Sequence, residues 1–221
     1  MRFSSYVYYI IFKLDANKSI MKYMQDLSPL FIQKANQIKV LLTDVDGVMT
    51  DGTLSFFTDE QGHTHEIKHF ESLDGMGLMY LAHCGIKTGI ISRGNSPTLE
   101  FWAEILGMDF LFYNTSVKHH ALDYLQQNFN VRPDEIAFIG DDLIDLGVLA
   151  RVGLPMAVAN SVRETKEKSL YISPLPGGHA AVRDIAEKIL QARGEWERVV
   201  AENLQGDFKA PKRNLHIVQG L

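Results

Sequence analysis

Two aspartates stand directly after an apolar run that begins near residue 40. The run Ile38–Leu42 leads through Thr43 into Asp44, and Asp46 follows after one further residue. A short apolar run is typical of a buried parallel strand, and ligands bind at the carboxyl ends of such strands. Side chains alternate along an extended chain, so Asp44 and Asp46 are expected on the same side. Two crowded carboxylates repel each other and need a cation or a proton between them.

An isolated Asp-x-Asp-Gly sequence also fits a solvated turn, so the interpretation depends on partners elsewhere in the chain. Such partners follow two other strand patterns and begin one helical pattern, where polar residues stand. Taken singly, these residues fit a helix cap, a surface charge and a solvated loop. In one parallel sheet they all face the same edge, which predicts a shared site. The residues concerned are Ser92, Lys118, Asp141, Asp142 and Asp145.

Phosphoryl transfer is the chemistry that needs this set of groups. An aspartate nucleophile forms an acyl phosphate and divides one difficult displacement into two steps. Mg²⁺ with oxygen ligands offsets the charge that a phosphate brings to a carboxylate. A hydroxyl and an ammonium group hold the remaining phosphate oxygens. A second carboxylate two residues after the nucleophile can protonate the leaving alkoxide and then activate water.

Alternating strand and helix patterns place these residues. Such an alternation predicts an α/β fold with a doubly wound parallel sheet. Asp74 is expected to be the N-cap of a helix that ends near Cys84, and the chain after Gly206 is expected to be irregular. Expected strands cover 38–43, 86–91, 110–113, 136–139, 155–158 and, as the last one, 171–172. Expected helices cover 27–36, 74–84, 98–106, 118–129, 146–150, 162–167 and 181–191, the last extending toward 202.

A β-hairpin is predicted just after the first acids. Residues 53–58 and 64–70 favour strands, and 59–62 form a turn sequence between them. A hairpin alone is marginally stable in water, so this one is expected to contact another subunit. The apolar side chains available for that contact are Phe56, Phe57, Ile67 and Phe70.

Length and composition limit the remaining possibilities. The chain has 221 residues and is 46% hydrophobic, enough for one full core. Its formal charge of −5 argues against nucleic acid or an anionic membrane as the main partner. The apolar segment Tyr6–Phe12 is too short to span a bilayer. Cys84 is the single cysteine, which excludes an intrachain disulfide and fits a reducing compartment. We expect Cys84 to be a small buried hydrophobe in a soluble, cytoplasmic protein.

These motifs resemble those of a known family. Asp44–Gly52, Ser92, Lys118 and Gly140–Asp145 resemble the four motifs of the haloacid dehalogenase superfamily. Thr50-Asp51-Gly52, the hairpin and Leu73–Gly77 are similar to the small phosphatases that act on 3-deoxy-D-manno-octulosonate 8-phosphate in lipopolysaccharide sugar biosynthesis. The resemblance covers about residues 38–190. It implies a capless Rossmann-like fold and a homotetramer in which central hairpins and neighbouring subunits help to close each site.

The resemblance also implies roles for single residues. Asp44 is expected to be the nucleophile and a metal ligand, and Asp46 the acid/base that gives its backbone carbonyl to the metal. Ser92 and Lys118 are expected to bind phosphate. After the later strand, Asp141 is expected to be a ligand of Mg²⁺. Asp142 and Asp145 are expected to support Asp141. The chain is accordingly expected to divide into an N-terminal extension with a short helix (1–37), a phosphatase core (38–190), and a helix end with a tail (191–221).

One motif departs from the family pattern. The family commonly has Ser/Thr-Gly-Arg where this chain has Ser92-Arg93-Gly94. A shift of one residue is expected to turn Arg93 to the other side of the chain, and Gly94 carries no charge to replace it. Recognition of a substrate carboxylate would then weaken unless a neighbouring subunit supplies a cation.

The predicted function is Mg²⁺-dependent hydrolysis of an acidic sugar phosphate, with 3-deoxy-D-manno-octulosonate 8-phosphate as the first candidate and an aspartyl-phosphate intermediate. A sibling phosphatase acting on another nonulosonate-type sugar phosphate is the enzyme alternative. A phospho-accepting receiver or an inactive assembly module is the alternative from another class. Receivers carry adjacent acids on their first strand, whereas here the adjacent pair follows a later strand.

Overall fold

The computed structural model describes residues 27–210 and 214–221. The apolar segment Tyr6–Phe12 lies outside the described residues. Within them, no helix combines the length and the apolar character needed to cross a membrane.

A seven-stranded parallel sheet forms the centre of the described structure, in the order β8-β7-β6-β1-β4-β5-β9. β1 lies between β6 and β4, and Thr43 at its end pairs with Ile139 and Ile90. The chain leaves β1 toward β4 and β5, then returns to β6 on the other side. That reversal creates the crevice where α/β proteins bind ligands. The strands are β1 Val40–Thr43, β4 Lys87–Ile91, β5 Phe110–Tyr113, β6 Ile136–Gly140, β7 Leu154–Ala157, β8 Tyr171–Ile172 and β9 His216–Gln219.

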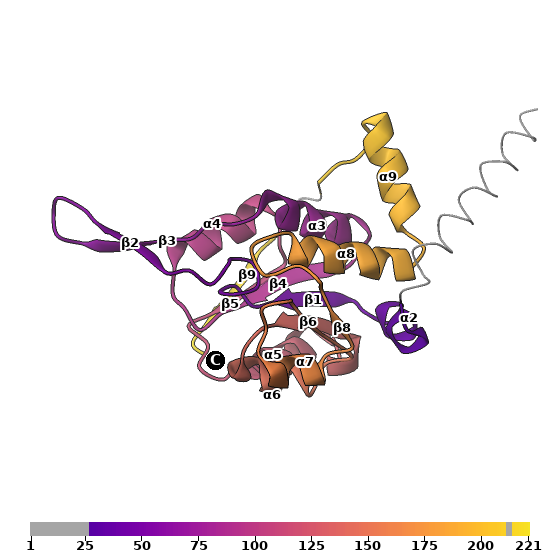
Figure 1. The fold of residues 1–221 in the computed structure, drawn as a ribbon, viewed down its shortest axis with the longest axis horizontal. Coiled ribbons are helices and arrows are strands. Elements are labelled where there is room, and N and C mark those ends of the chain that lie inside the picture. The colour runs from indigo at the N-terminus through magenta and orange to yellow at the C-terminus, as the bar shows by residue number, and fades with distance from the viewer. Residues whose placement is uncertain (1–26, 211–213) are drawn as a thin grey trace, which may run out of the picture.

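Helices cover both faces of this sheet, with α3, α4 and α8 on one face and α5, α6 and α7 on the other (Figure 1). The predicted doubly wound α/β fold is therefore confirmed. The helices are α2 Pro29–Ala35, α3 Ser72–His83, α4 Pro97–Ile105, α5 His120–Phe129, α6 Leu146–Leu149, α7 Arg163–Lys168, α8 Ala181–Ala192 and α9 Trp196–Gln205. Two 3₁₀ turns, Pro133–Glu135 and Leu143–Asp145, flank β6.

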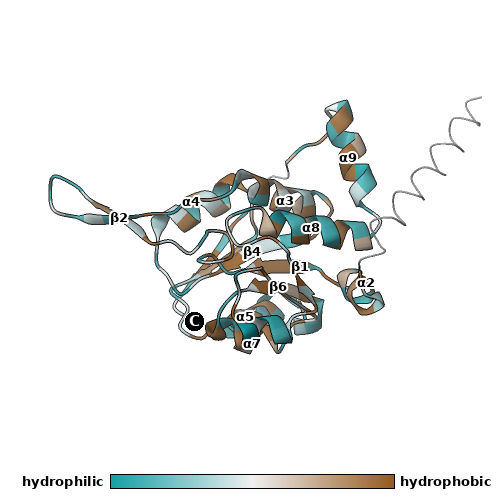
Figure 2. Ribbon diagram, viewed as in Figure 1, coloured by the Kyte–Doolittle hydropathy of each residue, from teal (hydrophilic) through white to brown (hydrophobic). Residues whose placement is uncertain are grey.

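The core has two parts, one on each face of the sheet. All four residues of β1 are buried. Leu41 packs into the cluster beneath α3 and α8, whereas Val40 and Leu42 pack into the cluster beneath α5. Figure 2 shows the corresponding pattern, with hydrophobic central strands and hydrophilic outer helix surfaces. Burial on both faces makes β1 a rigid support for the acids at its end. A Leu41→Ala change would cost about 2–5 kcal/mol of stability.

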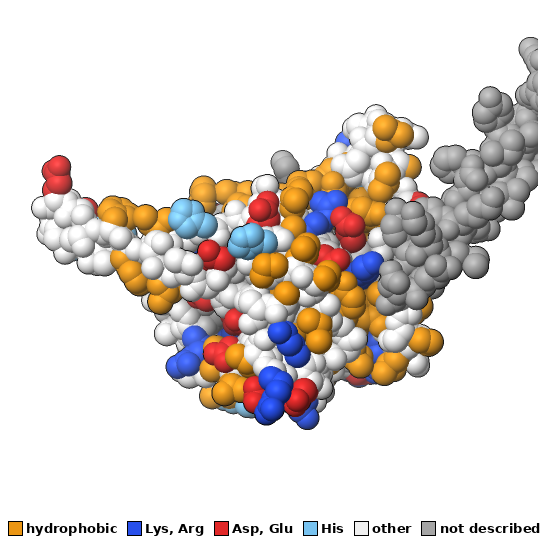
Figure 3. All heavy atoms as spheres, viewed as in Figure 1, with side chains coloured by type: hydrophobic (Ala, Val, Ile, Leu, Met, Phe, Trp, Pro, Cys, Tyr) orange, Lys and Arg blue, Asp and Glu red, His pale blue; other side chains and the backbone are white. Residues whose placement is uncertain are grey.

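The hairpin predicted after β1 is present, with β2 (Ser55–Thr58) antiparallel to β3 (Thr64–Ile67). It projects away from the body of the protein (Figure 1). Phe56 and Phe57 are 60% and 51% exposed, and hydrophobic side chains line the hairpin in Figure 3. Phe70 differs from the expectation, because its ring stacks on Trp102 at 4.9 Å and packs against the core of its own chain.

The cap of α3 is not Asp74, and that prediction is wrong. Glu71 is the N-cap, and its carboxylate accepts a hydrogen bond from the Leu73 amide at 3.1 Å. Asp74 lies buried in the first turn, where it accepts from the Arg183 amide at 2.8 Å. It therefore caps the start of α8 instead of its own helix.

The chain after α8 also differs from the prediction. The helix does not continue toward Glu202, because Gly194 takes a positive φ of 69° and α9 begins only at Trp196. The chain beyond Gly206 is not irregular throughout, and Tyr171–Ile172 is not the last strand. β9 pairs with β5 in parallel, from Phe110↔His216 to Tyr113↔Gln219. Part of the expected tail thus belongs to the central sheet.

Candidate active site

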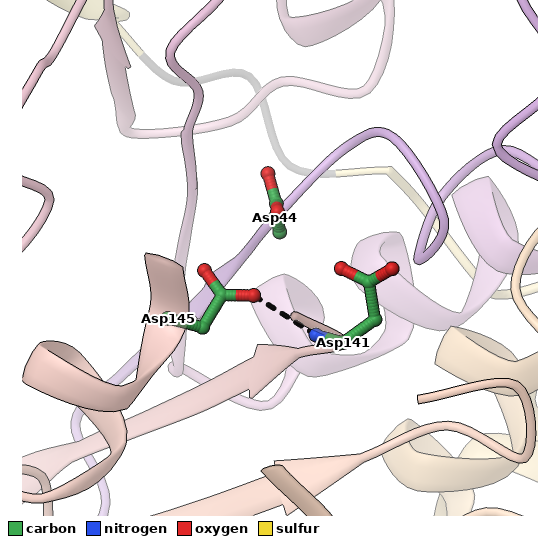
Figure 4. Close-up of side chains that lie close together, drawn as sticks. All are labelled: Asp44, Asp141 and Asp145. Carbon is green, nitrogen blue, oxygen red and sulfur yellow. Dashed lines mark hydrogen bonds between the residues drawn. The ribbon is translucent and has the colours of Figure 1, made fainter. Parts of the chain in front are cut away.

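Three carboxylates converge at the carboxyl ends of β1 and β6 (Figure 4). One oxygen each of Asp44, Asp141 and Asp145 lies within 4.8 Å of the other two. The parallel register brings them together, because Thr43 pairs with Ile139 and the Asp44 amide donates to the Ile139 carbonyl at 2.9 Å. These acids therefore lie together at one edge of the sheet, as predicted from the strand ends.

Asp44 is buried and held at both oxygens. Its Oδ1 accepts from the Val45 amide at 2.7 Å, and its Oδ2 forms an ion pair with Lys118 Nζ at 2.5 Å. Burial raises the pKa of Asp44 to about 6, the Lys118 ammonium opposes this rise, and the Asp145 carboxylate adds to it. The Asp44 carboxylate is therefore held in one orientation.

Lys118 lies between two carboxylates, with Nζ 2.5 Å from Asp44 and 2.8 Å from Asp145. It stands in the turn just before α5, which begins at His120 and not at Lys118 as predicted. Burial alone would lower the pKa of this ammonium, but Asp44 and Asp145 raise it above its ordinary value. Lys118 is thus a buried cation at the base of the site.

Asp145 orients the loop that carries Asp141. Its Oδ2 accepts from the amides of Asp141 at 2.9 Å and Asp142 at 3.3 Å, while Oδ1 accepts from Lys118. Asp142 faces outward and accepts from the Leu143 amide at 2.7 Å, capping a 3₁₀ turn. Asp145 itself is fully buried, so it acts on the site through its neighbours.

Asp141 has an oxygen, Oδ1, that is buried and makes no hydrogen bond within the described chain. Burial raises the pKa of Asp141 to about 7, and the carboxylates of Asp44 and Asp145 add to the rise. The loop after β1 approaches it closely, because a Cβ on Gly47 would lie 2.1 Å from Asp141 Oδ2. Gly47 also has a φ of 86°, so this turn requires glycine.

This site fits a hard divalent cation. Three carboxylates face each other with one ammonium group among them, and one buried carboxylate oxygen lacks a partner. Oxygen ligands of this kind are those that Mg²⁺ prefers. The predicted ligands Asp44 and Asp141 therefore lie where one ion can contact both.

A cavity of about 190 Å³ opens above these carboxylates. Ser92 follows β4 at its wall, buried, with Oγ accepting from the Gly94 amide at 3.0 Å. Arg93 also belongs to the residues that line the cavity, and it is exposed. The loop after β4 bends there and is no longer extended, so strand alternation does not apply. The lining residues are Asp44, Asp46, Ser92, Arg93, Gly94, Asp141, Asp142 and Ile144.

Lys68 is a site residue that the sequence did not reveal. Its Nζ lies 2.6 Å from Asp46 Oδ1 and 3.0 Å from Glu66, and its side chain is only 4% exposed. Burial would lower the pKa of Lys68, but Asp46 and Glu66 raise it. The residue directly follows β3, so the hairpin returns to the site at its base. The sequence signal that could have revealed it is a lysine at the end of a hairpin that starts from the loop after β1.

Two other candidate centres carry no chemistry. His63 and His65 on the hairpin are exposed and contact the Asp59 carboxylate. Cys84 is half-buried at the end of α3, and burial raises the pKa of its thiol to about 12, with Glu195 adding to the rise. Its thiol therefore stays protonated at neutral pH, which excludes a thiolate nucleophile there.

Comparison with known proteins identifies hydrolases that are similar to this chain. The haloacid dehalogenase-like hydrolase family matches residues 107–177. The 3-deoxy-D-manno-octulosonate 8-phosphate phosphatase KdsC of Yersinia pestis is 38% identical over 166 residues, which are 75% of this chain and 87% of the relative.

Two solved structures are also similar. A probable YrbI family phosphatase from Pseudomonas syringae pv. phaseolica superimposes with a TM-score of 0.75 at 39% identity, covering 80% of this chain and 98% of that one. The 3-deoxy-D-manno-octulosonate 8-phosphate phosphatase of Moraxella catarrhalis, in complex with magnesium, phosphate and KDO, has a TM-score of 0.73 at 33% identity, covering 78% of this chain and 97% of that one.

Proposed function

Because the chain belongs to the 3-deoxy-D-manno-octulosonate 8-phosphate phosphatases, a family of haloacid dehalogenase-like hydrolases, we propose that it hydrolyses this sugar phosphate with Mg²⁺. The observation that carries the proposal is the convergence of Asp44, Asp141 and Asp145 around Lys118. A buried acid at a strand end, fixed by a lysine and facing two more acids, suits nucleophilic attack on phosphorus.

Asp44 and Asp46 carry the bond changes in this proposal. A carboxylate oxygen of Asp44 attacks phosphorus, and the bond from phosphorus to the sugar oxygen breaks. Asp46 gives its proton to that leaving oxygen. It then takes a proton from a water molecule, which attacks the aspartyl phosphate and releases inorganic phosphate. Lys68 lies at hydrogen-bond distance from Asp46 and orients its carboxyl group.

The remaining residues bind the phosphate and the metal. Ser92 and Lys118 hold phosphate oxygens through the hydroxyl and the ammonium group. Mg²⁺ supplies positive charge that lets a phosphate dianion approach the carboxylates. Its proposed ligands are the carboxylates of Asp44 and Asp141 and the backbone carbonyl of Asp46. The residues proposed to support them are Asp142, which caps the adjoining turn, and Asp145, which accepts the Asp141 amide.

We also propose that the protein is a homotetramer in the cytoplasm and acts in lipopolysaccharide sugar biosynthesis. The hairpin supports the assembly, because its apolar side chains remain exposed in the described chain. Leu54, Phe56, Phe57 and Ile67 are all exposed. The unit that carries the chemistry runs from residue 38 to 190 in this proposal, with 1–37 and 191–221 as additions to it.

Phosphate release from a panel of sugar phosphates tests the proposed function. The panel contains 3-deoxy-D-manno-octulosonate 8-phosphate, a nine-carbon keto-acid sugar phosphate and neutral hexose phosphates, each with and without Mg²⁺. We expect the octulosonate to have the highest kcat/KM and chelation to abolish turnover. Asp44→Asn protein, which keeps the shape of the side chain, is the control for contaminating phosphatases. Preferred hydrolysis of neutral sugar phosphates would contradict the proposal.

The sibling substrate is a second candidate because of the Ser92-Arg93-Gly94 order. Arg93 is exposed at the cavity wall and forms no ion pair within the described residues, so its guanidinium is available to an anion. The double variant Arg93→Gly, Gly94→Arg restores the family order. Sharper preference for the octulosonate in that variant would show that the wild-type order relaxes specificity. An unchanged profile in an already selective enzyme would refute this.

A further inference from the structure

One short loop connects three of the segments that meet at the acidic site. We call Ala159–Val162, between β7 and α7, the bracket loop. It makes hydrogen bonds to the loop after β1, to the loop after β6, and to the glycine loop at 174–178 that precedes α8. None of its side chains belongs to the proposed catalytic or metal-binding groups.

The bracket loop fixes the backbone beside Asp141. The Val162 amide donates to the Asp141 carbonyl at 2.8 Å, and Ser161 Oγ donates to the Gly140 carbonyl at 3.2 Å. Ser161 Oγ also accepts from the Val158 amide at 3.0 Å, so its hydroxyl is held from both sides. These bonds are buried and anchor the end of β6 to the bracket loop.

Asn160 makes the corresponding connection to the loop after β1. Its Nδ2 donates to the Gly47 carbonyl at 2.9 Å, and its Oδ1 accepts from the Gly177 amide at 2.7 Å. An amide N–H can only donate and a carbonyl can only accept, so both partners fix the orientation of this side chain. No other polar group in residues 27–210 or 214–221 makes both connections.

The glycine loop completes this support by direct backbone contact. The Gly178 amide donates to the Val48 carbonyl at 3.0 Å. A Cβ on Gly177 would lie 2.0 Å from the Gly47 carbonyl oxygen, and one on Gly178 would lie 2.5 Å from the Asp51 amide nitrogen. The two backbones therefore pack so closely that only glycine fits.

Two successive carbonyls of the catalytic loop, those of Gly47 and Val48, are thus occupied by this support. The carbonyl just before them, that of Asp46, receives no hydrogen bond from the described residues. The Asp46 carbonyl thus receives no hydrogen bond within the described chain, whereas the next carbonyl along the chain, that of Gly47, is fixed by Asn160. Asp141, on the other strand, is tied to the same bracket loop.

We propose that Asn160 is a positioning residue for the metal site, which sets the Asp44–Gly47 backbone against the backbone of Asp141. This rests on the proposed function, in which Mg²⁺ is held by groups from both segments. Outer partners that orient metal ligands typically contribute about 10- to 100-fold to metal affinity. Loss of the Asn160 amide should accordingly weaken Mg²⁺ binding even though the side chain touches no ligand atom.

Calorimetric titration of the full-length protein with MgCl₂ tests this without recourse to activity. We expect Asn160→Ala to weaken Mg²⁺ binding about 10-fold or more. Asn36→Ala is the matched control, because Asn36 Nδ2 also bridges backbone carbonyls of separate elements, at 2.8 Å to Ile32 and 3.2 Å to Ala192. The control should lose a comparable amount of thermal stability and keep the wild-type Mg²⁺ affinity.

Asn160→Asp decides the matter should the alanine variant fail to fold. An aspartate keeps the acceptor for the Gly177 amide but cannot donate to the Gly47 carbonyl. Its added negative charge would by itself tighten Mg²⁺ binding, so weaker binding reports the lost bond to Gly47. Unchanged or tighter binding by Asn160→Asp overturns the proposal.

The outcomes separate this inference from the function it rests on. Wild-type protein that binds Mg²⁺ and releases phosphate, together with an Asn160→Ala variant of equal Mg²⁺ affinity, overturns only the role of Asn160. Wild-type protein that binds no Mg²⁺ and releases no phosphate overturns the proposed function as well. Equal losses of affinity in Asn160→Ala and Asn36→Ala would assign the effect to general stability, which also overturns the positioning role.

Discussion

Lowering the pH from 8 to 6 should weaken Mg²⁺ binding to this protein, because the ion must displace protons from two carboxyl groups. Burial raises the pKa of Asp141 to about 7, with Asp44 and Asp145 adding to the rise. Burial likewise raises the pKa of Asp44 to about 6 against the opposing charge of Lys118. Metal ligands bind in their deprotonated form, so protons and Mg²⁺ compete at both groups.

The size of the effect follows from these two values. About 90% of Asp141 groups are ionised at pH 8 and about 10% at pH 6, which weakens binding about 9-fold. Asp44 is almost fully ionised at pH 8 and about half ionised at pH 6, which adds a factor of about 2. Together the affinity for Mg²⁺ should fall about 20-fold between pH 8 and pH 6.

Titration calorimetry in two buffers of different ionisation enthalpy measures both the affinity and the protons released. Near pH 6.5 we expect release of about one proton per Mg²⁺, most of it from Asp141. Asp141→Asn should bind more weakly and retain only about a twofold dependence on pH, from Asp44. Equal wild-type affinity at pH 6 and pH 8, with no proton release, would refute the assignment of raised pKa values to these ligands.

Further expectations concern stability, catalysis, assembly and the thiol. Folding raises the pKa of the Asp44 and Asp141 carboxyls, so protonation of these groups stabilises the folded state. Metal-free protein should therefore lose thermal stability as the pH rises through about 6–7, and added Mg²⁺ should abolish that loss; a rising melting temperature would contradict it. Asp44→Asn should lower turnover ~10³-fold or more, and Asp46→Asn should slow hydrolysis while Mg²⁺ binding, followed by calorimetry, stays nearly intact. The double variant Phe56→Ser, Phe57→Ser should dissociate the proposed tetramer in light scattering, unlike the wild type; wild-type monomers at micromolar concentration would exclude the assembly. Iodoacetamide should leave Cys84 largely unmodified at pH 7.5, as measured by mass spectrometry, and rapid alkylation would disprove its protonated state.

The strand ends were predictable because each apolar run is short and stops at a polar residue. β1, β6 and β4 end where the sequence places Asp44, Asp141 and Ser92, and a parallel sheet aligns such ends without further information. Lys68 and Asn160 were not predictable in this way. Their partners lie 22 and 113 residues away, and only the folded path of the hairpin and the bracket loop brings them close.

Other differences arise from tertiary structure that overrides local signals. Asp74 has the chemistry of an N-cap, but its burial against α8 gives it another amide to accept from. β9 is a mostly exposed edge strand of four residues in a polar segment, so it carries little hydrophobic pattern. Its pairing with β5 depends on an exposed strand edge that the sequence near residue 216 does not report.

The return of the hairpin to the catalytic loop has a practical consequence for protein engineering. The tip, Glu60–Gly62, is exposed and touches only the hairpin itself, so it should accept an inserted peptide or a reporter group. The base is different, because Lys68 directly follows β3 and is bonded to Asp46. A variant made monomeric by deleting the whole hairpin would lose this lysine with it. Shortening from the tip, with Lys68 retained, is the design that separates assembly from chemistry.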